Sequence, residues 1–204
     1  TDNGPQQVRY NSGMLERKGS VHEGGIHVPF FMRWPGRLQP GRTVDRIAAH
    51  IDLTPTLLEA CKVPKARGVV FDGLSLWPLL RGEKTTWPDR TLYFQWHRGD
   101  EPELYRAFAA RTQPYKLVQP LGVNARTAAQ PAFKLFDMSN DPLEQRDIAN
   151  DHPEVVERMR QGYERWFREV SQTRGFGPPR IHLGATQENP VMLTRQDWRG
   201  PRAG

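Results

Sequence analysis

The strongest helical signal in the chain runs from Asp151 to Val170 and reads DHPEVVERMRQGYERWFREV. Asp151 followed three residues later by Glu154 resembles a capping box, and Pro153 suits the first turn of a helix. Apolar residues then recur at helical spacing along one stripe, at Val155, Val156, Met159, Tyr163, Trp166, Phe167 and Val170. The pattern predicts an amphipathic helix whose apolar stripe covers one face of a sheet.

Four candidate strands precede this helix, at Thr91–Trp96, Tyr105–Arg111, Tyr115–Gln119 and Phe133–Met138. Gln113-Pro114 is a tight connection between the middle pair, which predicts a hairpin. An antiparallel sheet with one face packed by a helix is an α+β unit. We therefore expect an α+β subdomain over residues 86–172, followed by a Pro- and Gly-rich tail over residues 173–204.

The first 85 residues have a different pattern, with short apolar runs separated by turn signals. Val28–Trp34 is a nearly continuous apolar run that Pro35 ends, which predicts a short strand buried on both faces. Ile47–Ile51 indicates a second extended piece. Asp52 or Thr54 can cap the helix that follows, and its expected apolar face consists of Leu57, Leu58 and Cys61.

The composition limits the classes of partner. The chain has 29 Lys and Arg against 23 Asp and Glu, a net charge of +6, which favours anionic partners such as nucleic acid, acidic glycans or sulfate and phosphate esters. Because the basic residues are scattered rather than clustered, we do not expect a nucleic-acid partner. The single cysteine excludes an internal disulfide framework and a Cys-based zinc site. No apolar run approaches the length of about 20 residues that spans a membrane, so no membrane partner is expected.

Residues with metal- and anion-binding chemistry lie at the start of the chain. Asp2 and Asn3 place a carboxylate beside an amide oxygen, and such hard ligands suit Ca²⁺ or Mg²⁺. Lys18 follows one loop later and offers an ammonium that can hold an anionic oxygen. Each signal alone is weak, because an Asx-Gly pair is usually a plain turn and most lysines are solvated. Since the chain opens inside this candidate site, we expect it to be the back part of a longer enzyme.

Taken in order, several motifs of the chain resemble those of type I sulfatases, within the alkaline-phosphatase-like superfamily. The motifs are Thr1-Asp2-Asn3-Gly4, Lys18-Gly19, Glu23-Gly24-Gly25, Val28-Pro29, Trp34-Pro35-Gly36, Asp52-Leu53-Thr54-Pro55-Thr56, Asp72-Gly73-Leu74, Tyr115-Lys116-Leu117, Leu135-Phe136-Asp137 and Asp141-Pro142-Leu143-Glu144. Their shared order is far more specific than any one of them. The resemblance implies that residues 1–85 are the C-terminal part of the sulfatase α/β sandwich domain, and that residues 86–172 are the small subdomain with a four-stranded antiparallel sheet and a helix.

The resemblance also implies roles for individual residues. Asp2 and Asn3 match the second pair of Ca²⁺ ligands of the family, and Lys18 matches the lysine that contacts the sulfate and steadies the leaving oxygen. These roles suit the chemistry, because cleaving a sulfate ester develops negative charge that a divalent ion and a lysine can stabilise. In the smaller subdomain, His97 and Arg98 are candidates for contact with an anionic or sugar substrate, with a plain polar turn as the alternative.

The chain departs from the family pattern in one central respect. Sulfatases use a formylglycine nucleophile made in a Cys/Ser-x-Pro-x-Arg motif, which this sequence lacks. Cys61 lies in Cys-Lys-Val-Pro-Lys, and its place on the apolar face of the expected helix indicates a buried structural thiol. The first Asp-Asp metal pair and the upstream catalytic His and Lys are absent as well. We expect all of these in a missing N-terminal part of the same enzyme, so this stretch alone should be inactive. His27 stands where the family commonly has arginine, so no role is assigned to it.

The expected function is hydrolysis of a sulfated small molecule or glycan to an alcohol and sulfate. The family resemblance suggests a periplasmic or secreted enzyme. Two alternatives stay open: a phosphoesterase or phosphonate hydrolase of the same superfamily, and a non-catalytic remnant or binding module.

Overall fold

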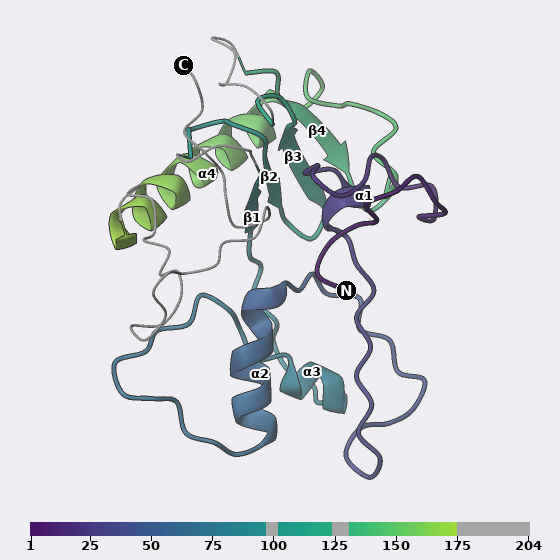
Figure 1. The fold of residues 1–204 in the computed structure, drawn as a ribbon, viewed down its shortest axis with the longest axis vertical. Coiled ribbons are helices and arrows are strands. Elements are labelled where there is room, and N and C mark those ends of the chain that lie inside the picture. Colours follow the sequence, from purple (N-terminus) through teal and green to yellow (C-terminus); the bar gives the residue numbers. More distant parts are fainter. Residues whose placement is uncertain (97–101, 124–130, 175–204) are drawn as a thin grey trace, which may run out of the picture.

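The computed structural model of the protein describes residues 1–96, 102–123 and 131–174. The elements follow in the order α1 (Glu23–Ile26), a 3₁₀ turn η1 (His50–Asp52), α2 (Leu53–Ala60), α3 (Trp77–Arg81), β1 (Leu92–Gln95), β2 (Phe108–Arg111), β3 (Tyr115–Gln119), β4 (Lys134–Asp137) and α4 (Pro153–Arg174). Figure 1 shows α2 and α3 at one end of the molecule and the sheet with α4 at the other. None of the helices in the described ranges combines the length and the apolar character of a membrane span.

The second half of the chain folds as predicted. Its sheet has the order β1-β2-β3-β4, and every neighbouring pair is antiparallel. The expected hairpin joins β2 to β3, closed by a hydrogen bond that the backbone N–H of Thr112 donates to the carbonyl of Tyr115 over 2.9 Å. Each observed strand lies within its predicted range, and α4 begins at Pro153. The predicted antiparallel sheet with a packed helix is therefore confirmed.

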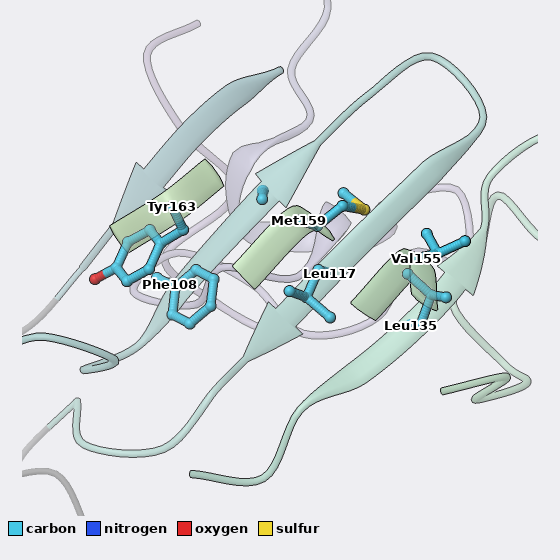
Figure 2. Packing of buried hydrophobic residues seen from close by; sticks show 7 residues of the cluster. Phe108, Leu117, Leu135, Val155, Met159 and Tyr163 are labelled. Atoms are coloured by element: carbon cyan, nitrogen blue, oxygen red, sulfur yellow. The ribbon is translucent and has the colours of Figure 1, made fainter. Parts of the chain in front are cut away.

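One face of the sheet packs on α4 and forms the larger core. Phe108 from β2, Leu117 from β3 and Leu135 from β4 meet Val155, Met159 and Tyr163 from α4 (Figure 2). The rings of Phe108 and Tyr163 stack with centroids 3.7 Å apart. Each buried side chain of this size contributes about 1.5–3 kcal/mol relative to an exposed one, so this face accounts for much of the stability of the second half.

The opposite face of the sheet is covered by the N-terminal segment. Side chains alternate along a strand, so Ala109, Val118 and Phe136 point away from α4. These three residues are buried together with Met138 and with Val21, which lies just before α1. The sheet is thus enclosed between α4 on one side and residues near position 21 on the other.

The first half of the chain contains three departures from the sequence predictions. Residues 28–34 form no strand, and Phe31 is 91% exposed. His50 to Asp52 form a 3₁₀ turn rather than the end of an extended piece. The helix α2 buries Thr56 and Ala60, whereas Leu57 and Cys61 are exposed, so the prediction of a buried thiol is wrong. The physical reason is that an apolar run needs a partner strand or helix to bury it, and none of the described residues covers these side chains.

Candidate functional site

The first 27 residues form a loop that is closed by backbone hydrogen bonds. The amide of Gly4 donates to the carbonyl of Gly25 over 2.9 Å, and the amide of Lys18 donates to the carbonyl of Pro5 over 3.1 Å. The second bond joins Lys18 to a residue only two positions after Asn3. The structure therefore brings the backbones of the predicted metal ligands and of the predicted catalytic lysine to the same end of this loop.

Glycine is required where these backbone segments meet. A Cβ atom on Gly4 would lie 1.8 Å from the carbonyl oxygen of Gly24, and one on Gly24 would lie 2.1 Å from the carbonyl oxygen of Glu16. Both distances are far below van der Waals contact, so any side chain at either position would force the loop open. The glycines of two of the sequence motifs thus keep the loop closed.

Asp2 and Asn3 provide the kind of oxygen ligands that Ca²⁺ takes, but only a small part of a full set. Asp2 is exposed, and the Nδ2 of Asn3 donates to its Oδ2 over 2.6 Å. Calcium takes six to eight oxygens, more than one carboxylate and one amide can supply. No group of three or more His, Cys, Asp or Glu in the described part of the chain could hold a metal ion. The pair fits Ca²⁺ in chemistry, and further ligands would have to come from outside the described residues.

Of the remaining predicted site residues, Lys18 is among the described residues, whereas His97 and Arg98 are not. The side chain of Lys18 is exposed, and across residues 1–96, 102–123 and 131–174 no carboxylate forms an ion pair with it. An ammonium in this state is available to an external anion.

A buried ionic cluster, which the sequence analysis did not predict, joins this loop to the sheet. Lys116 on β3 is completely buried, and its Nζ lies 2.8 Å from Oε1 of Glu23 and 2.9 Å from Oε1 of Glu144. Glu144 also accepts a hydrogen bond from the backbone N–H of Glu23 over 2.7 Å. We call Glu23, Lys116 and Glu144 the buried ionic cluster.

Two histidines extend the buried ionic cluster on the loop side. Nδ1 of His27 lies 2.9 Å from Glu23, and Nδ1 of His22 lies 3.3 Å from Glu144. Burial raises the pKa of Glu23, but the hydrogen bond with His27 and the charge of Lys116 outweigh it and lower that pKa to about 2. The hydrogen bond to Glu23 in turn raises the pKa of His27. His27, to which the sequence analysis assigned no role, thus supports the cluster.

The cluster explains why three separated motifs occur together. Glu23, Lys116 and Glu144 come from the Glu-Gly-Gly, Tyr-Lys-Leu and Asp-Pro-Leu-Glu motifs of the sequence. A usable signal was the lysine between Tyr115 and Leu117 in a predicted strand, because a buried lysine requires buried carboxylates. Through this cluster, the sheet of the second half determines where α1 and the loop around Lys18 lie.

A second ionic contact joins the helices of the first half to the start of the sheet. Arg90 donates two hydrogen bonds to the fully buried carboxylate of Asp52, over 2.7 and 2.6 Å. The same carboxylate accepts the amides of Ala49 and Leu74, each over 2.8 Å. Asp52 was predicted as a helix cap, and it does precede α2. Its side chain makes no cap hydrogen bond and binds Arg90 instead.

Comparison with known proteins identifies relatives of most of the chain. A family model described as "N-sulphoglucosamine sulphohydrolase, C-terminal" matches residues 13–168. The chain is 30% identical to the uncharacterized sulfatase YdeN of Escherichia coli K12 over 193 residues, which cover 79% of this chain and 32% of YdeN. It is 27% identical to human steryl-sulfatase over 152 residues, which cover 64% of this chain and 25% of that enzyme. The chain thus spans a third or less of these relatives.

Solved structures agree with the fold. The crystal structure of Ps i-CgsB matches with a TM-score of 0.68 and 24% identity over 85% of this chain and 36% of that protein. Another crystal structure holds Ps i-CgsB in complex with k-i-k-neocarrahexaose. The structural match shows a shared fold, and the family match over residues 13–168 shows that the chain belongs to the sulfatase family and carries its C-terminal portion.

Proposed function

We propose that this chain forms one side of the active site of an enzyme that hydrolyses sulfate esters of a glycan or a small molecule. The observation that carries the proposal is the closed loop, which holds the backbone of Lys18 beside that of Asp2 and Asn3 through the bond to Pro5. A carboxylate, an amide oxygen and an ammonium are groups whose chemistry suits an anionic ester and a divalent ion bound to it. One solved structure of similar fold is that of BT4656 in complex with its substrate, the sulfated sugar D-Glucosamine-2-N, 6-O-disulfate.

In the proposed reaction, Asp2 and Asn3 would help to hold Ca²⁺, and this ion would supply positive charge that offsets the negative charge of the sulfate ester. An oxygen of the nucleophile forms a bond to sulfur while the sulfur–oxygen ester bond breaks, and the electron pair of the broken bond goes to the departing alcohol oxygen. The ammonium of Lys18 stabilises that negative charge and can donate a proton to it. The nucleophile, a formylglycine, would come from a part of the enzyme outside this chain.

The exposed apolar residues of the first half support a role as part of a larger domain. Phe30, Phe31, Leu57 and Val70 are 52%, 91%, 51% and 86% exposed. Large apolar side chains that are exposed in this number suit a surface that another part of the protein covers. We infer that the N-terminal part of the same enzyme covers it and adds the remaining metal ligands. Export to the periplasm or the cell exterior is the location that we expect from the family.

The test compares the intact enzyme with its Lys18→Ala variant on 4-nitrophenyl sulfate. We expect kcat to fall about 100-fold or more, because one charge-stabilising donor is lost. The melting temperature should change little, because Lys18 is exposed. Lys84→Ala, at another exposed lysine, is the matched control and should leave kcat unchanged.

Other outcomes of this assay would replace the proposal. Unchanged kcat in Lys18→Ala would remove Lys18 from the mechanism. Preferential hydrolysis of 4-nitrophenyl phosphate by the unaltered enzyme would favour a phosphoesterase. Failure to hydrolyse either ester would favour a non-catalytic binding protein.

A further inference from the structure

The loop between the predicted metal ligands and Lys18 encloses an open hollow that the proposed chemistry does not use. The hollow has a volume of about 440 Å³, and its polar lining includes Gln7, Arg9, Asn11, Glu16 and Arg17. A hollow of this volume has room for a small molecule, and it lies open to solvent. Since the loop starts after Asn3 and closes at Lys18, the hollow adjoins the candidate site.

The loop that forms the hollow is held in a defined shape by its own contacts. The Nδ2 of Asn11 donates to the carbonyls of Met14 and Glu16, over 2.8 and 3.1 Å. The chain turns at Ser12 and Gly13, which both have positive φ, and a Cβ on Gly13 would lie 3.6 Å from Leu143. The hollow is therefore largely formed before any ligand binds, which reduces the entropic cost of binding.

The charges of the lining favour an anion. Arg9 and Arg17 line the hollow together with one carboxylate, Glu16, and the ammonium of Lys18 follows directly in the sequence. Within the three described ranges, neither arginine forms an ion pair, and Arg9 donates one hydrogen bond to Gln7 over 3.0 Å. A guanidinium has five donors and binds sulfate or carboxylate oxygens in pairs, so both side chains have donors to offer to a ligand.

The same loop also presents apolar surface. Tyr10 is 90% exposed and Val8, which lines the hollow, is 87% exposed. The loop thus exposes an aromatic ring in addition to the charged donors of its two arginines. A sulfated sugar has this combination of an apolar ring face and anionic substituents, whereas an inorganic anion has only the second.

We propose that residues 5–17 form a subsite for a second anionic sugar unit, adjacent to the unit whose sulfate ester is cleaved. Arg9 and Arg17 bind the sulfate or carboxylate group of that unit, and Tyr10 packs on its ring. This inference rests on the proposed function, and it narrows the substrate class to sulfated oligosaccharides. The loop thus selects chain length and charge, while Lys18 serves the reaction itself.

The test measures the binding of a heparin-derived tetrasaccharide and of a carrageenan hexasaccharide to the intact enzyme by isothermal titration calorimetry. We expect the double variant Arg9→Gln, Arg17→Gln to weaken the Kd of the tighter ligand about tenfold or more, because two charge-assisted contacts are lost. Arg158→Gln, an exposed arginine on α4, is the charge-matched control and should change Kd less than twofold. The KM and kcat for 4-nitrophenyl sulfate should stay unchanged in every variant.

Glu16→Gln gives a result of the opposite sign, which general damage to the loop would not produce. Removing the one carboxylate of the lining should tighten oligosaccharide binding about twofold. The proposal is overturned if neither oligosaccharide binds, if the double variant binds as the unaltered enzyme does, or if 4-nitrophenyl sulfate turnover falls in parallel. An enzyme that binds the oligosaccharides through Arg9 and Arg17 but cleaves no sulfate ester would disprove the proposed function and leave the subsite standing.

Discussion

The two halves of the chain differ in how they bury their apolar residues. The sheet and α4 enclose their own core, in which Phe108, Leu117 and Tyr163 are fully buried. In the first half, by contrast, Phe31 and Val70 are 91% and 86% exposed, and α2 buries only Thr56 and Ala60. The core between the sheet and α4 therefore needs no residue of the first half, whereas the first half exposes apolar side chains as a surface prepared for a partner would. The buried ionic cluster joins the two.

The largest expected effect comes from breaking the cluster that joins the halves. The Nζ of Lys116 lies 2.8 Å from the carboxylate of Glu23 and 2.9 Å from that of Glu144. Lys116→Met removes this cation and leaves both carboxylates buried. We expect the free energy of unfolding to fall by about 3–5 kcal/mol, measured by urea denaturation. The triple variant Glu23→Gln, Lys116→Met, Glu144→Gln should recover much of this loss. A loss below about 1 kcal/mol in Lys116→Met would mean that the cluster does not hold the halves together.

A comparable effect is expected in the core of the second half. Tyr163→Ala removes the ring that stacks on Phe108 and should cost about 3–5 kcal/mol in the same assay. Tyr163→Phe keeps the ring and removes only the hydroxyl, so it should change the free energy of unfolding by less than about 1 kcal/mol. Equal losses in both variants would show that the stability comes from the hydroxyl rather than from ring packing.

The pH dependence of stability should reflect the cluster. The folded pKa of Glu23, about 2, lies below the ordinary value of 4.5, so its contribution is complete above pH 4.5 and is lost as the pH falls from 4.5 towards 2. This contribution is on the order of 3 kcal/mol. His27 has a raised pKa, so its smaller contribution is complete below pH 6.5 and is lost as the pH rises through the folded value.

Urea titrations at several pH values measure the free energy of unfolding on the acid side, where Glu23 titrates (the acid limb), and above pH 6.5, where His27 titrates (the His27 limb). Glu23→Gln should flatten the acid limb and also remove the His27 limb, because the two groups are partners 2.9 Å apart. His27→Gln should remove only the second limb. An acid limb that persists unchanged in Glu23→Gln would assign it to other carboxylates.

The smallest effect is expected at the exposed surface of the first half. Phe31→Ser should change the stability of residues 1–204 by less than about 0.5 kcal/mol, because the ring is 91% exposed. In the intact enzyme, where we propose that the N-terminal part covers this surface, the same variant should lower the melting temperature by several degrees. Equal effects in both proteins would mean that no other part of the enzyme packs on Phe31.

The sequence predicted the second half well because its signals are local. The helical stripe from Val155 to Val170 and the alternating strands can be recognised within windows of a few residues. The strand predicted at Val28–Trp34 was wrong because an apolar run does not show which neighbour would pair with it. The division of the chain near residue 85 stays a prediction, as do the metal and catalytic roles of Asp2, Asn3 and Lys18.

The contacts that complete the candidate site could not be predicted because they join distant positions. Glu23 and Lys116 are 93 residues apart, and Glu23 and Glu144 are 121 apart. Neither spacing leaves a periodic trace in the sequence. The hydrogen bond from Lys18 to Pro5 joins a backbone N–H, which every residue except proline has, to a backbone carbonyl, which every residue has. Side-chain identities could therefore not reveal it. Glu23, Lys116 and Glu144 all lie in the recognised motifs, but only the fold showed that they meet.

The position of Val21 and Glu23 against the sheet has a consequence for how the protein can be divided. A fragment that begins at residue 86 would lose the cover over Ala109, Val118 and Phe136, and its Lys116 would lose Glu23 and keep only Glu144 as a counter-charge. The smallest piece that keeps both faces of the sheet enclosed is discontinuous and needs residues 1–27 together with residues 86–174. A nick in the connecting stretch would therefore leave two peptides that stay associated, so a cut chain can still migrate as one particle.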